Sequence, residues 1–205
     1  IAKEYYTKKA TVIIPYKEDR GWLQEAIASV PTQAQLILSQ GNGNWPANFN
    51  KVLDQVEGEY VRYLHEDDML TPDSLEKTIQ AIEQQGVDFI HGDAIELKQA
   101  DQTKRLWRSP EPFPTLSALL HRNTLHSVSM MYKTEVFAKL GGFDETLWVC
   151  EEYEFHLRCL KNKMKLGYCP LPLGIYRRHP AQKVRTAGKD IKVEEHRKLI
   201  ALYGR

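Results

Sequence analysis

Residues 11–14, Thr-Val-Ile-Ile, form a continuous run of β-branched and apolar residues that ends at Pro15. Such a run predicts a strand buried on both faces, which is the kind that parallel sheets use. A helix is expected over residues 23–30, because apolar residues recur there at i, i+4 and i+7, and Pro31 ends it. The chain therefore opens as a strand followed by a helix.

The same alternation continues to residue 91. Further strands are expected at residues 35–38, 60–64 and 87–91. Further helices are expected around residues 52–56, ending at Gly58, and from Thr71-Pro72-Asp73 to Gly86, with residues 41–46 as a loop. This order predicts an α/β domain with a mostly parallel sheet and helices on both faces. Ligands of such sheets bind beyond the carboxyl ends of the strands.

The second half of the chain is less regular. We expect an irregular connection at 108–115, a strand at 127–132, helices at 133–140 and 151–161, and a proline-rich break at 170–174 before residues 175–177. No internal repeat or linker divides the chain. We therefore predict one domain over residues 1–205, with a nucleotide-binding half (10–92), an acceptor and catalytic half (93–182) and a C-terminal helix (183–205).

Composition excludes several classes of protein. The chain has 205 residues, of which 42% are hydrophobic, and its net charge of +1 provides no general attraction to nucleic acid. Its three cysteines, Cys150, Cys159 and Cys169, form no C-x-x-C pair, so neither a disulfide framework nor a zinc ribbon is expected. No apolar run approaches the 18 or so residues that cross a bilayer, and no signal peptide is expected. We expect a cytoplasmic protein, and attachment to the inner membrane face is left open.

An acidic segment, His65-Glu-Asp-Asp68, directly follows the strand at 60–64. Adjacent carboxylates repel one another unless a cation or a proton lies among them, and hard divalent ions prefer carboxylate oxygens. The segment therefore indicates a metal site. The alternative is a solvated acidic turn that leads into the helix at Thr71.

A second polar segment, Pro15-Tyr-Lys-Glu-Asp19, lies at the end of the first strand. A nucleotide could bind there, with Tyr16 stacking on its base, or the segment could be an ordinary turn. No G-x-G-x-x-G motif follows this strand and no G-K-[ST] occurs in the chain, which disfavours a dinucleotide site and a P-loop.

Two later segments carry the remaining candidates. Glu151 and Glu152 begin a predicted helix, where the helix dipole stabilises acids, but one of them could also act as a general base. The segment Tyr176-Arg-Arg-His179 combines guanidinium groups with an imidazole, which suits a diphosphate and a metal, although a basic surface loop is the alternative.

Taken in order, these segments resemble the family 2 glycosyltransferases with the GT-A fold. The matching motifs are Val12-Ile-Ile-Pro-Tyr16, Leu64-His-Glu-Asp-Asp-Met-Leu-Thr-Pro72, Gly142-Phe-Asp-Glu145, Glu151-Glu152 followed by Leu157-Arg158, and Tyr176 to His179. The resemblance covers roughly residues 10 to 182. It implies transfer of a sugar, with inversion, from a nucleotide-diphosphate sugar to a carbohydrate or glycolipid acceptor, with Mn²⁺ or Mg²⁺ as cofactor. A UDP-sugar donor is favoured by family frequency.

The resemblance also implies roles for single residues. Glu152 matches the base that deprotonates the acceptor hydroxyl. The metal ligands that the resemblance implies are Asp67, His179 and His65, which stands in the place of the motif's first acid. The residues implied to bind the nucleotide sugar are Pro15, Tyr16, Lys17, Glu18, Gln40, Asp68 and Arg178. Trp148, four residues before Glu152, is expected to stack on a sugar of the acceptor, unless it is a core tryptophan.

The chain departs from the family pattern at three places. His65 replaces an acid, Ser39-Gln40 replaces the usual Asp-Asp after the second strand, and Glu152 stands where Asp is commoner. These departures motivate an alternative, in which a catalytically inactive module binds a nucleotide or glycan. A sugar-nucleotide pyrophosphorylase is a second alternative, but it requires a Gly-rich, basic loop after the first strand, which residues 16–19 do not provide.

Overall fold

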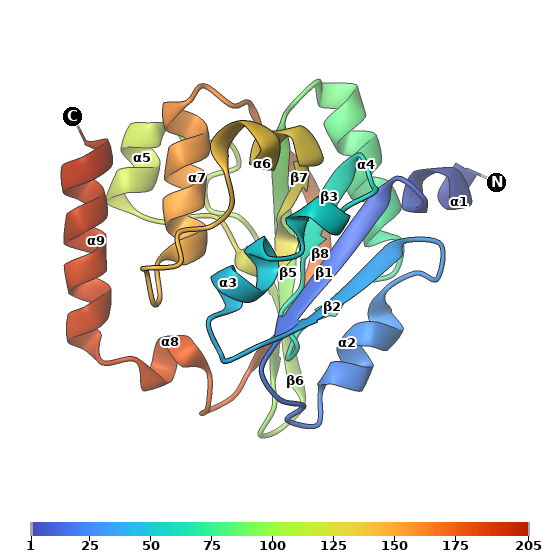
Figure 1. Cartoon of the computed structure of the whole chain (residues 1–205), viewed down its shortest axis with the longest axis horizontal. Coiled ribbons are helices and arrows are strands. Elements are labelled where there is room, and N and C mark those ends of the chain that lie inside the picture. The colour runs from blue at the N-terminus through green and yellow to red at the C-terminus, as the bar shows by residue number, and fades with distance from the viewer. Residues whose placement is uncertain (1, 205) are drawn as a thin grey trace.

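A computed structural model describes residues 2–204, whose strands form one eight-stranded mixed sheet (Figure 1). The strands are β1 (Ala10–Tyr16), β2 (Gln35–Gln40), β3 (Tyr60–Tyr63), β4 (Met69–Leu70), β5 (Phe89–Lys98), β6 (Thr103–Trp107), β7 (Met131–Lys133) and β8 (Leu166–Arg178). Their order in space is β2-β1-β3-β7-β5-β8-β4, and β6 pairs with β5. The α/β class predicted from the alternating pattern is confirmed.

Strand direction changes within the sheet. β1 pairs in parallel with β2 and β3, and β5 pairs in parallel with β8. The short strand β7 lies antiparallel between β3 and β5, and β6 extends β5 as an antiparallel hairpin. The strand predicted at residues 87–91 is therefore the start of a longer strand, and it is not a direct neighbour of β3.

Helices cover both faces of the sheet. They are α1 (Ala2–Thr7), α2 (Leu23–Ser29), α3 (Trp45–Asn50), α4 (Ser74–Gln85), α5 (Leu116–His121), α6 (Thr134–Leu140), α7 (Glu151–Lys161), α8 (Lys183–Thr186) and α9 (Lys189–Tyr203), with short 3₁₀ turns η1 (Leu53–Gln55) and η2 (Ser127–Ser129). One apolar cluster joins α2 and α4 to the sheet, and a second joins α3, α5, α6, α7 and α9 to its other face. Fully buried side chains such as Ile14 and Phe155 each stabilise the fold by about 1.5–3 kcal/mol.

The prediction of a helix around residues 52–56 is wrong. A helix, α3, lies earlier, at Trp45–Asn50, and its first two residues fall in the loop predicted at 41–46. Asn44 caps it by accepting a hydrogen bond from the amide of Ala47 (3.1 Å), and Pro46 occupies its first turn, where a missing N–H costs nothing. This start signal outweighs the apolar spacing of the later valines, of which Val52 has ψ near 8° and precedes a single 3₁₀ turn.

Three other boundaries differ from the sequence prediction. The hydroxyl of Thr71 does not cap α4 but donates to the carbonyl of Pro172 (2.5 Å), and the helix begins at Ser74. The prolines at 170 and 172 do not break the chain, because they lie inside β8, whose register with β5 shifts opposite Gly92 and Asp93. Residues 127–129 form η2 rather than the first half of a strand.

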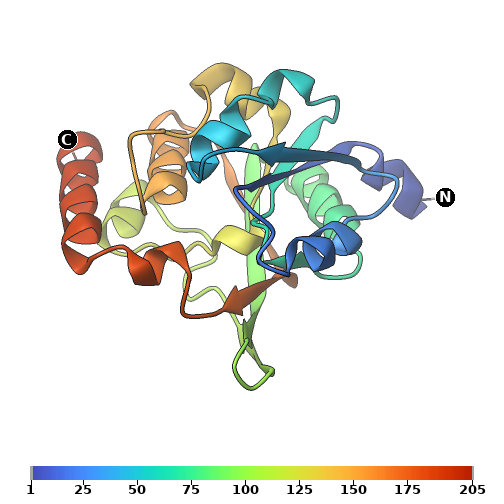
Figure 2. The same ribbon diagram turned by 60° about the horizontal axis from the view of Figure 1, so that its bottom comes forward.

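The C-terminal segment forms two helices, α8 and α9, rather than the single one predicted (Figure 2). α9 lies beside α7, and the buried carboxylate of Glu195 accepts hydrogen bonds from the amides of Trp148 (2.6 Å), Val149 (3.0 Å) and Cys150 (3.0 Å). α9 therefore fixes the turn from which α7 starts. Within residues 2–204, no helix combines the length and the apolar character needed to cross a membrane.

Candidate functional site

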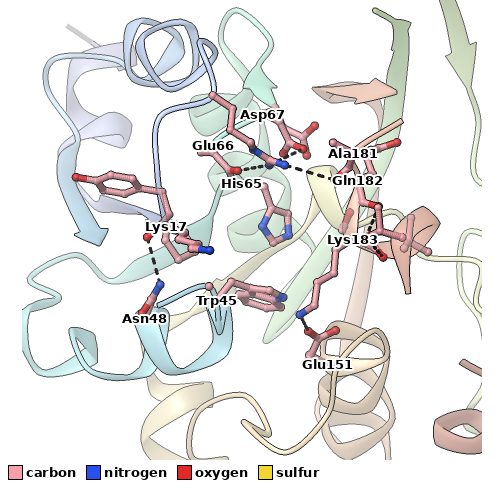
Figure 3. A pocket seen from close by; sticks show the side chains of 18 of the residues that line it. Lys17, Trp45, Asn48, His65, Glu66, Asp67, Glu151, Ala181, Gln182 and Lys183 are labelled. Atoms are coloured by element: carbon pink, nitrogen blue, oxygen red, sulfur yellow. Dashed lines mark hydrogen bonds and ion pairs between the residues drawn. The ribbon is translucent and has the colours of Figure 1, made fainter. Parts of the chain in front are cut away.

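A pocket of about 480 Å³ opens beyond the carboxyl ends of β1 and β3 (Figure 3). Segments from both halves of the chain form its wall: residues 15–20, 42–48, 65–68, 148–152, 176 and 181–186. Its position agrees with the general rule for ligands of parallel sheets. All four segments that the sequence singled out contribute to this wall.

The first residue of the acidic segment does not face the others. His65 Nε2 lies 2.7 Å from Glu152 Oε1, so the two side chains form a pair. Burial lowers the pKa of His65, but the hydrogen bond and negative charge of Glu152 outweigh burial and raise it to about 10. Burial raises the pKa of Glu152, but the hydrogen bond from His65 reverses this and holds it below its usual value. His65, which was expected to be a metal ligand, therefore contacts the candidate base rather than Asp67 or His179, the other two expected ligands.

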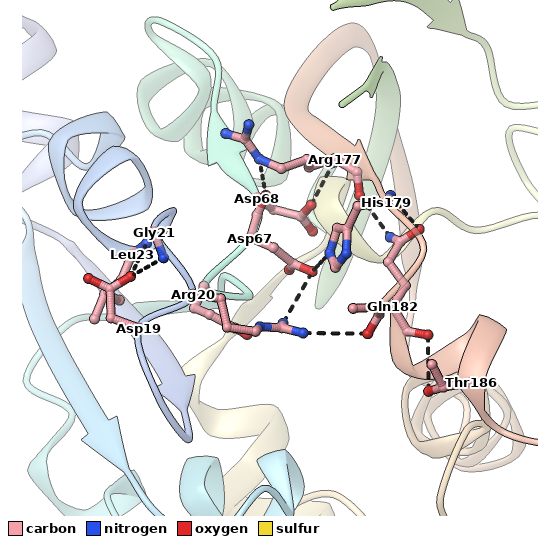
Figure 4. A network of polar contacts seen from close by, with 12 residues as sticks. Asp19, Arg20, Gly21, Leu23, Asp67, Asp68, Arg177, His179, Gln182 and Thr186 are labelled. Atoms are coloured by element: carbon pink, nitrogen blue, oxygen red, sulfur yellow. Dashed lines mark hydrogen bonds and ion pairs between the residues drawn. The ribbon is translucent and has the colours of Figure 1, made fainter. Parts of the chain in front are cut away.

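Asp67, which lines the pocket, contacts the buried side chain of His179, which lies 112 residues later in the sequence. The distance from His179 Nε2 to Asp67 Oδ2 is 2.8 Å (Figure 4). The ring of Trp22 packs against the imidazole, with 4.4 Å between the ring centroids. Burial raises the pKa of Asp67, but the hydrogen bond from His179 lowers it overall. Asp68 is buried beside them, and burial and the charge of Asp67 raise its pKa.

The donor atoms here fit a divalent cation in part. Asp67 and His179 present oxygen and nitrogen ligands together, and Oδ2 of Asp68 is buried without a hydrogen-bond partner. However, in the part of the chain that the structure describes, no three His, Cys, Asp or Glu side chains are placed to hold one ion. Asp67 and His179 would supply two ligands to such an ion, and water or a bound diphosphate would have to complete the coordination.

One side of the pocket, formed by residues 15–18, contains most of the residues expected to bind the nucleotide. Pro15, Tyr16, Lys17 and Glu18 all line it, and so does Asp68. Gln40 does not line the pocket. Its side chain donates a hydrogen bond to the carbonyl of Lys17 (3.2 Å) and so supports the loop that follows β1.

Asn48 and Trp45, both from α3, complete this side. Asn48 donates to the carbonyl of Tyr16 (3.3 Å), and the Trp45 ring lies edge-on to His65 at 5.0 Å. Neither residue was predicted to line the site. The sequence pattern placed Trp45 in a loop at residues 41–46 and assigned no role to Asn48.

The Gly142-Phe-Asp-Glu145 motif supports the wall from outside. Asn50, at the end of α3, accepts from the amide of Phe143 (2.9 Å) and donates to its carbonyl (2.8 Å). The Phe143 ring packs against Trp45 at 4.7 Å. A Cβ at Gly142 would lie 2.1 Å from the Asn50 side chain, so the close approach requires glycine. The motif therefore holds α3 in position.

Trp148 is not a core tryptophan. Its side chain is 46% exposed and lines the pocket, and the ammonium group of Lys183 lies 4.3 Å from its ring centre. Lys183 also contacts Glu151 (2.5 Å). Burial raises the pKa of Glu151 to about 7, although Lys183 opposes the shift. Of the two acids that begin α7, one is therefore held by Lys183 and the other by His65.

The structure does not bring Arg178 to the pocket. Its guanidinium group lies 3.4 Å from Glu96 on the outer part of the sheet. Arg177 is buried and binds backbone and side chains around residues 67–69, including the carbonyl of Asp67 (2.9 Å). The arginine that does line the pocket is Arg20, one residue beyond the polar segment 15–19 that the sequence indicated.

Comparison with known proteins gives one family. A sequence model described as Glycosyl transferase family 2 matches residues 23–141. An uncharacterized glycosyltransferase of Methanocaldococcus jannaschii is 29% identical over 137 residues, which make up 63% of this chain and 45% of that protein. The chain thus spans less than half the length of this curated relative.

Solved structures of glycosyltransferases share the fold. TarS of S. aureus (residues 1–349), solved in complex with UDP-GlcNAc, has a TM-score of 0.74 at 17% identity, over 95% of this chain and 66% of that one. The mannosyltransferase PcManGT from Pyrobaculum calidifontis, solved with GDP-Man and Mn²⁺, has a TM-score of 0.56 at 12% identity, over 82% of this chain and 56% of that one. At these identities the likeness establishes the GT-A architecture.

Proposed function

The chain belongs to glycosyl transferase family 2, and we propose on that basis that it transfers a sugar from a nucleoside-diphosphate sugar to a carbohydrate or glycolipid acceptor, with inversion and with a divalent cation. UDP is the favoured nucleotide, since TarS was solved with UDP and with UDP-GlcNAc.

One observation carries the proposal. Tyr16, Lys17, Asp67 and Glu152 line a single pocket, although they come from three separate segments, and the buried side chain of His179 contacts Asp67 (2.8 Å). Sugar transfer from a nucleotide needs a base-binding wall, a site for the diphosphate charge and a proton acceptor facing the same space. The residues named above are the candidates for these three roles.

Asp67 and His179 would bind the cation in place of the hydrogen bond that they now form with each other. When bound, a divalent cation supplies charge that stabilises the leaving diphosphate. The remaining chemistry belongs to the chain. Tyr16 and Trp45 offer aromatic faces on the nucleotide side, and Asp68, whose raised pKa reflects its burial, accepts the amide of Arg177 (2.9 Å) and so fixes the acidic turn against β8.

Glu152 would accept the proton of the acceptor hydroxyl as its oxygen attacks the anomeric carbon. The bond from that carbon to the diphosphate oxygen breaks, and its electron pair leaves with the nucleotide. A base with a low pKa suffices when proton transfer lags bond breaking. His65 holds Oε1 of Glu152 at 2.7 Å and so orients the carboxylate toward the pocket.

Calorimetry with UDP, GDP and dTDP tests the proposal. We expect UDP to bind in the presence of Mn²⁺ or Mg²⁺, and EDTA to weaken this binding, because Asp67 and His179 cannot neutralise a diphosphate without a cation. The affinity for uridine, which has no phosphate, should change neither with the metal ion nor with EDTA. If none of the three nucleotides binds, the proposed function is wrong. If EDTA does not change the affinity for UDP, the assignment of a metal cofactor is wrong.

For the acceptor, we expect Trp148→Ala to raise the KM about 3- to 10-fold while donor affinity stays the same, because a half-exposed indole at the pocket wall offers a face to a sugar ring. Phe113, which is 65% exposed and outside this pocket, provides the matched control as Phe113→Ala. An equal loss for donor and acceptor would instead assign Trp148 a role in holding the start of α7.

A further inference from the structure

The pocket is acidic for a site that must receive a diphosphate. Six Asp and Glu side chains contribute to its wall, against three lysine and arginine side chains and the imidazole of His65, which is paired with Glu152. The carboxylates are those of Glu18, Glu66, Asp67, Asp68, Glu151 and Glu152, and the cations are Lys17, Arg20 and Lys183. Like charges repel strongly in a partly enclosed site. Positive charge held close to Asp67 therefore decides whether an anion can bind there.

Arg20 is the cation that reaches the acidic segment. It lies in the loop between β1 and α2, and its Nη2 hydrogen-bonds the carboxylate of Glu66 and lies 3.7 Å from Oδ2 of Asp67. Its Nη1 donates to the carbonyl of Ala181 (3.4 Å) on the opposite wall. Figure 4 shows the Arg20 side chain extending from its loop toward Asp67. The guanidinium thus lies beside the residues that would hold the cation.

Lys183, which also lines the pocket, does not reach the acidic segment. Lys183 contacts Glu151 and the Trp148 ring on the acceptor side. Arg178, which the family pattern implied as the diphosphate ligand, binds Glu96 away from the pocket. Arg20 keeps 32% of its side chain exposed, so an incoming ligand can reach it.

We propose that Arg20 binds the diphosphate of the nucleotide, exchanging its contact with Glu66 for phosphate oxygens. This inference rests on the proposed function and names the residue that supplies the charge. A guanidinium presents a planar fork of N–H donors that matches two phosphate oxygens. The same contact stabilises the charge that the diphosphate gains when the bond to the sugar breaks. Because Arg20 belongs to the chain, part of the affinity for nucleotide persists without a metal ion.

The experiment compares UDP and uridine binding by calorimetry, each with Mn²⁺ and with EDTA. Arg20→Gln is expected to weaken UDP binding about 10- to 100-fold under both conditions. Uridine binding should not change, which shows that the pocket is intact. Arg20→Lys, which keeps the charge but not the fork, should recover part of the loss. Arg105→Gln is the matched control, because Arg105 pairs with Glu96 on the outer part of the sheet (2.7 Å).

Several outcomes overturn the inference. Unchanged UDP binding in Arg20→Gln, or an equal loss for UDP and uridine, would exclude a diphosphate contact. A loss of UDP affinity in Arg178→Gln but not in Arg20→Gln would return the role to the residue implied by the family pattern. If the unaltered protein binds UDP and Arg20→Gln binds it equally well, only this inference fails. If the unaltered protein binds no nucleoside diphosphate, the proposed function fails, and this inference with it.

Discussion

Glu152→Gln is expected to lower turnover by a factor of about 10² to 10⁴ while donor affinity stays close to that of the parent. Glutamine keeps the size of the side chain and can still contact His65, which now lies 2.7 Å from Oε1 of Glu152, but it cannot accept the acceptor's proton. The measurement is release of the nucleoside diphosphate at saturating donor, combined with calorimetry of donor binding.

Glu151→Gln is the matched control for this substitution. Glu151 also begins α7 and lines the pocket, but its carboxylate contacts Lys183 rather than His65. We expect a much smaller change in turnover. Asp67→Ala should differ from both variants, because it is expected to lower donor affinity to the value measured for the parent in EDTA. If Glu152→Gln and Asp67→Ala lose donor affinity equally, Glu152 has a structural role and is not the base.

Acid should destabilise the folded protein steeply between pH 6.5 and pH 4, because three histidines are held neutral. Burial lowers the pKa of His91, His126 and His156 to about 4. The unfolded chain takes up protons near pH 6.5, whereas the folded chain resists them until about pH 4. Their contribution to stability is therefore complete above pH 6.5 and lost as the pH falls, by about 1.4 kcal/mol per pH unit for each histidine.

His156→Gln isolates one of these groups. His156 is 1% exposed and its Nε2 lies 2.8 Å from the hydroxyl of Tyr132, a contact that the glutamine amide can imitate. Urea unfolding at pH 7.0 and pH 4.5 should show the free energy of unfolding falling about 2–3 kcal/mol less in the variant than in the parent. Glu152, which opposes the shift, and His91, which adds to it, are unchanged in both proteins.

His121→Gln is the control for the acid experiment, because His121 is exposed at the end of α5. Its stability should follow that of the parent at both pH values. Parallel curves for the parent and His156→Gln would show that His156 does not titrate differently in the folded and unfolded chains.

Local sequence patterns determined much of the fold. The run 11–14 became the buried core of β1, and α7 begins and ends at the predicted residues. α4 ends as predicted at Gly86, whose φ of 61° suits glycine. These features depend on neighbours within a few residues, so the chain encodes them locally. The short helix α3 was missed because a capping asparagine and a proline outweighed apolar spacing.

The order of motifs also indicated which segments would build the pocket. The segments around Tyr16, Asp67, Glu152 and His179 all reach it, and three of them follow or precede strands whose ends meet at one edge of the sheet. The resemblance to a family supplied their roles. Residue types and chain order were enough for this, because strand ends in such sheets gather ligands irrespective of loop detail.

Only the tertiary structure decided which charged groups face one another. His65 and Glu152 are 87 residues apart and form a pair, Arg20 rather than Arg178 approaches Asp67, and Lys183 lies over Trp148. Alternation along β8 places Arg178 on the outer part of the sheet, while a loop outside any strand delivers Arg20 to the pocket. A charge acts through distance in space and through burial, and neither quantity is contained in the spacing of residues along the chain.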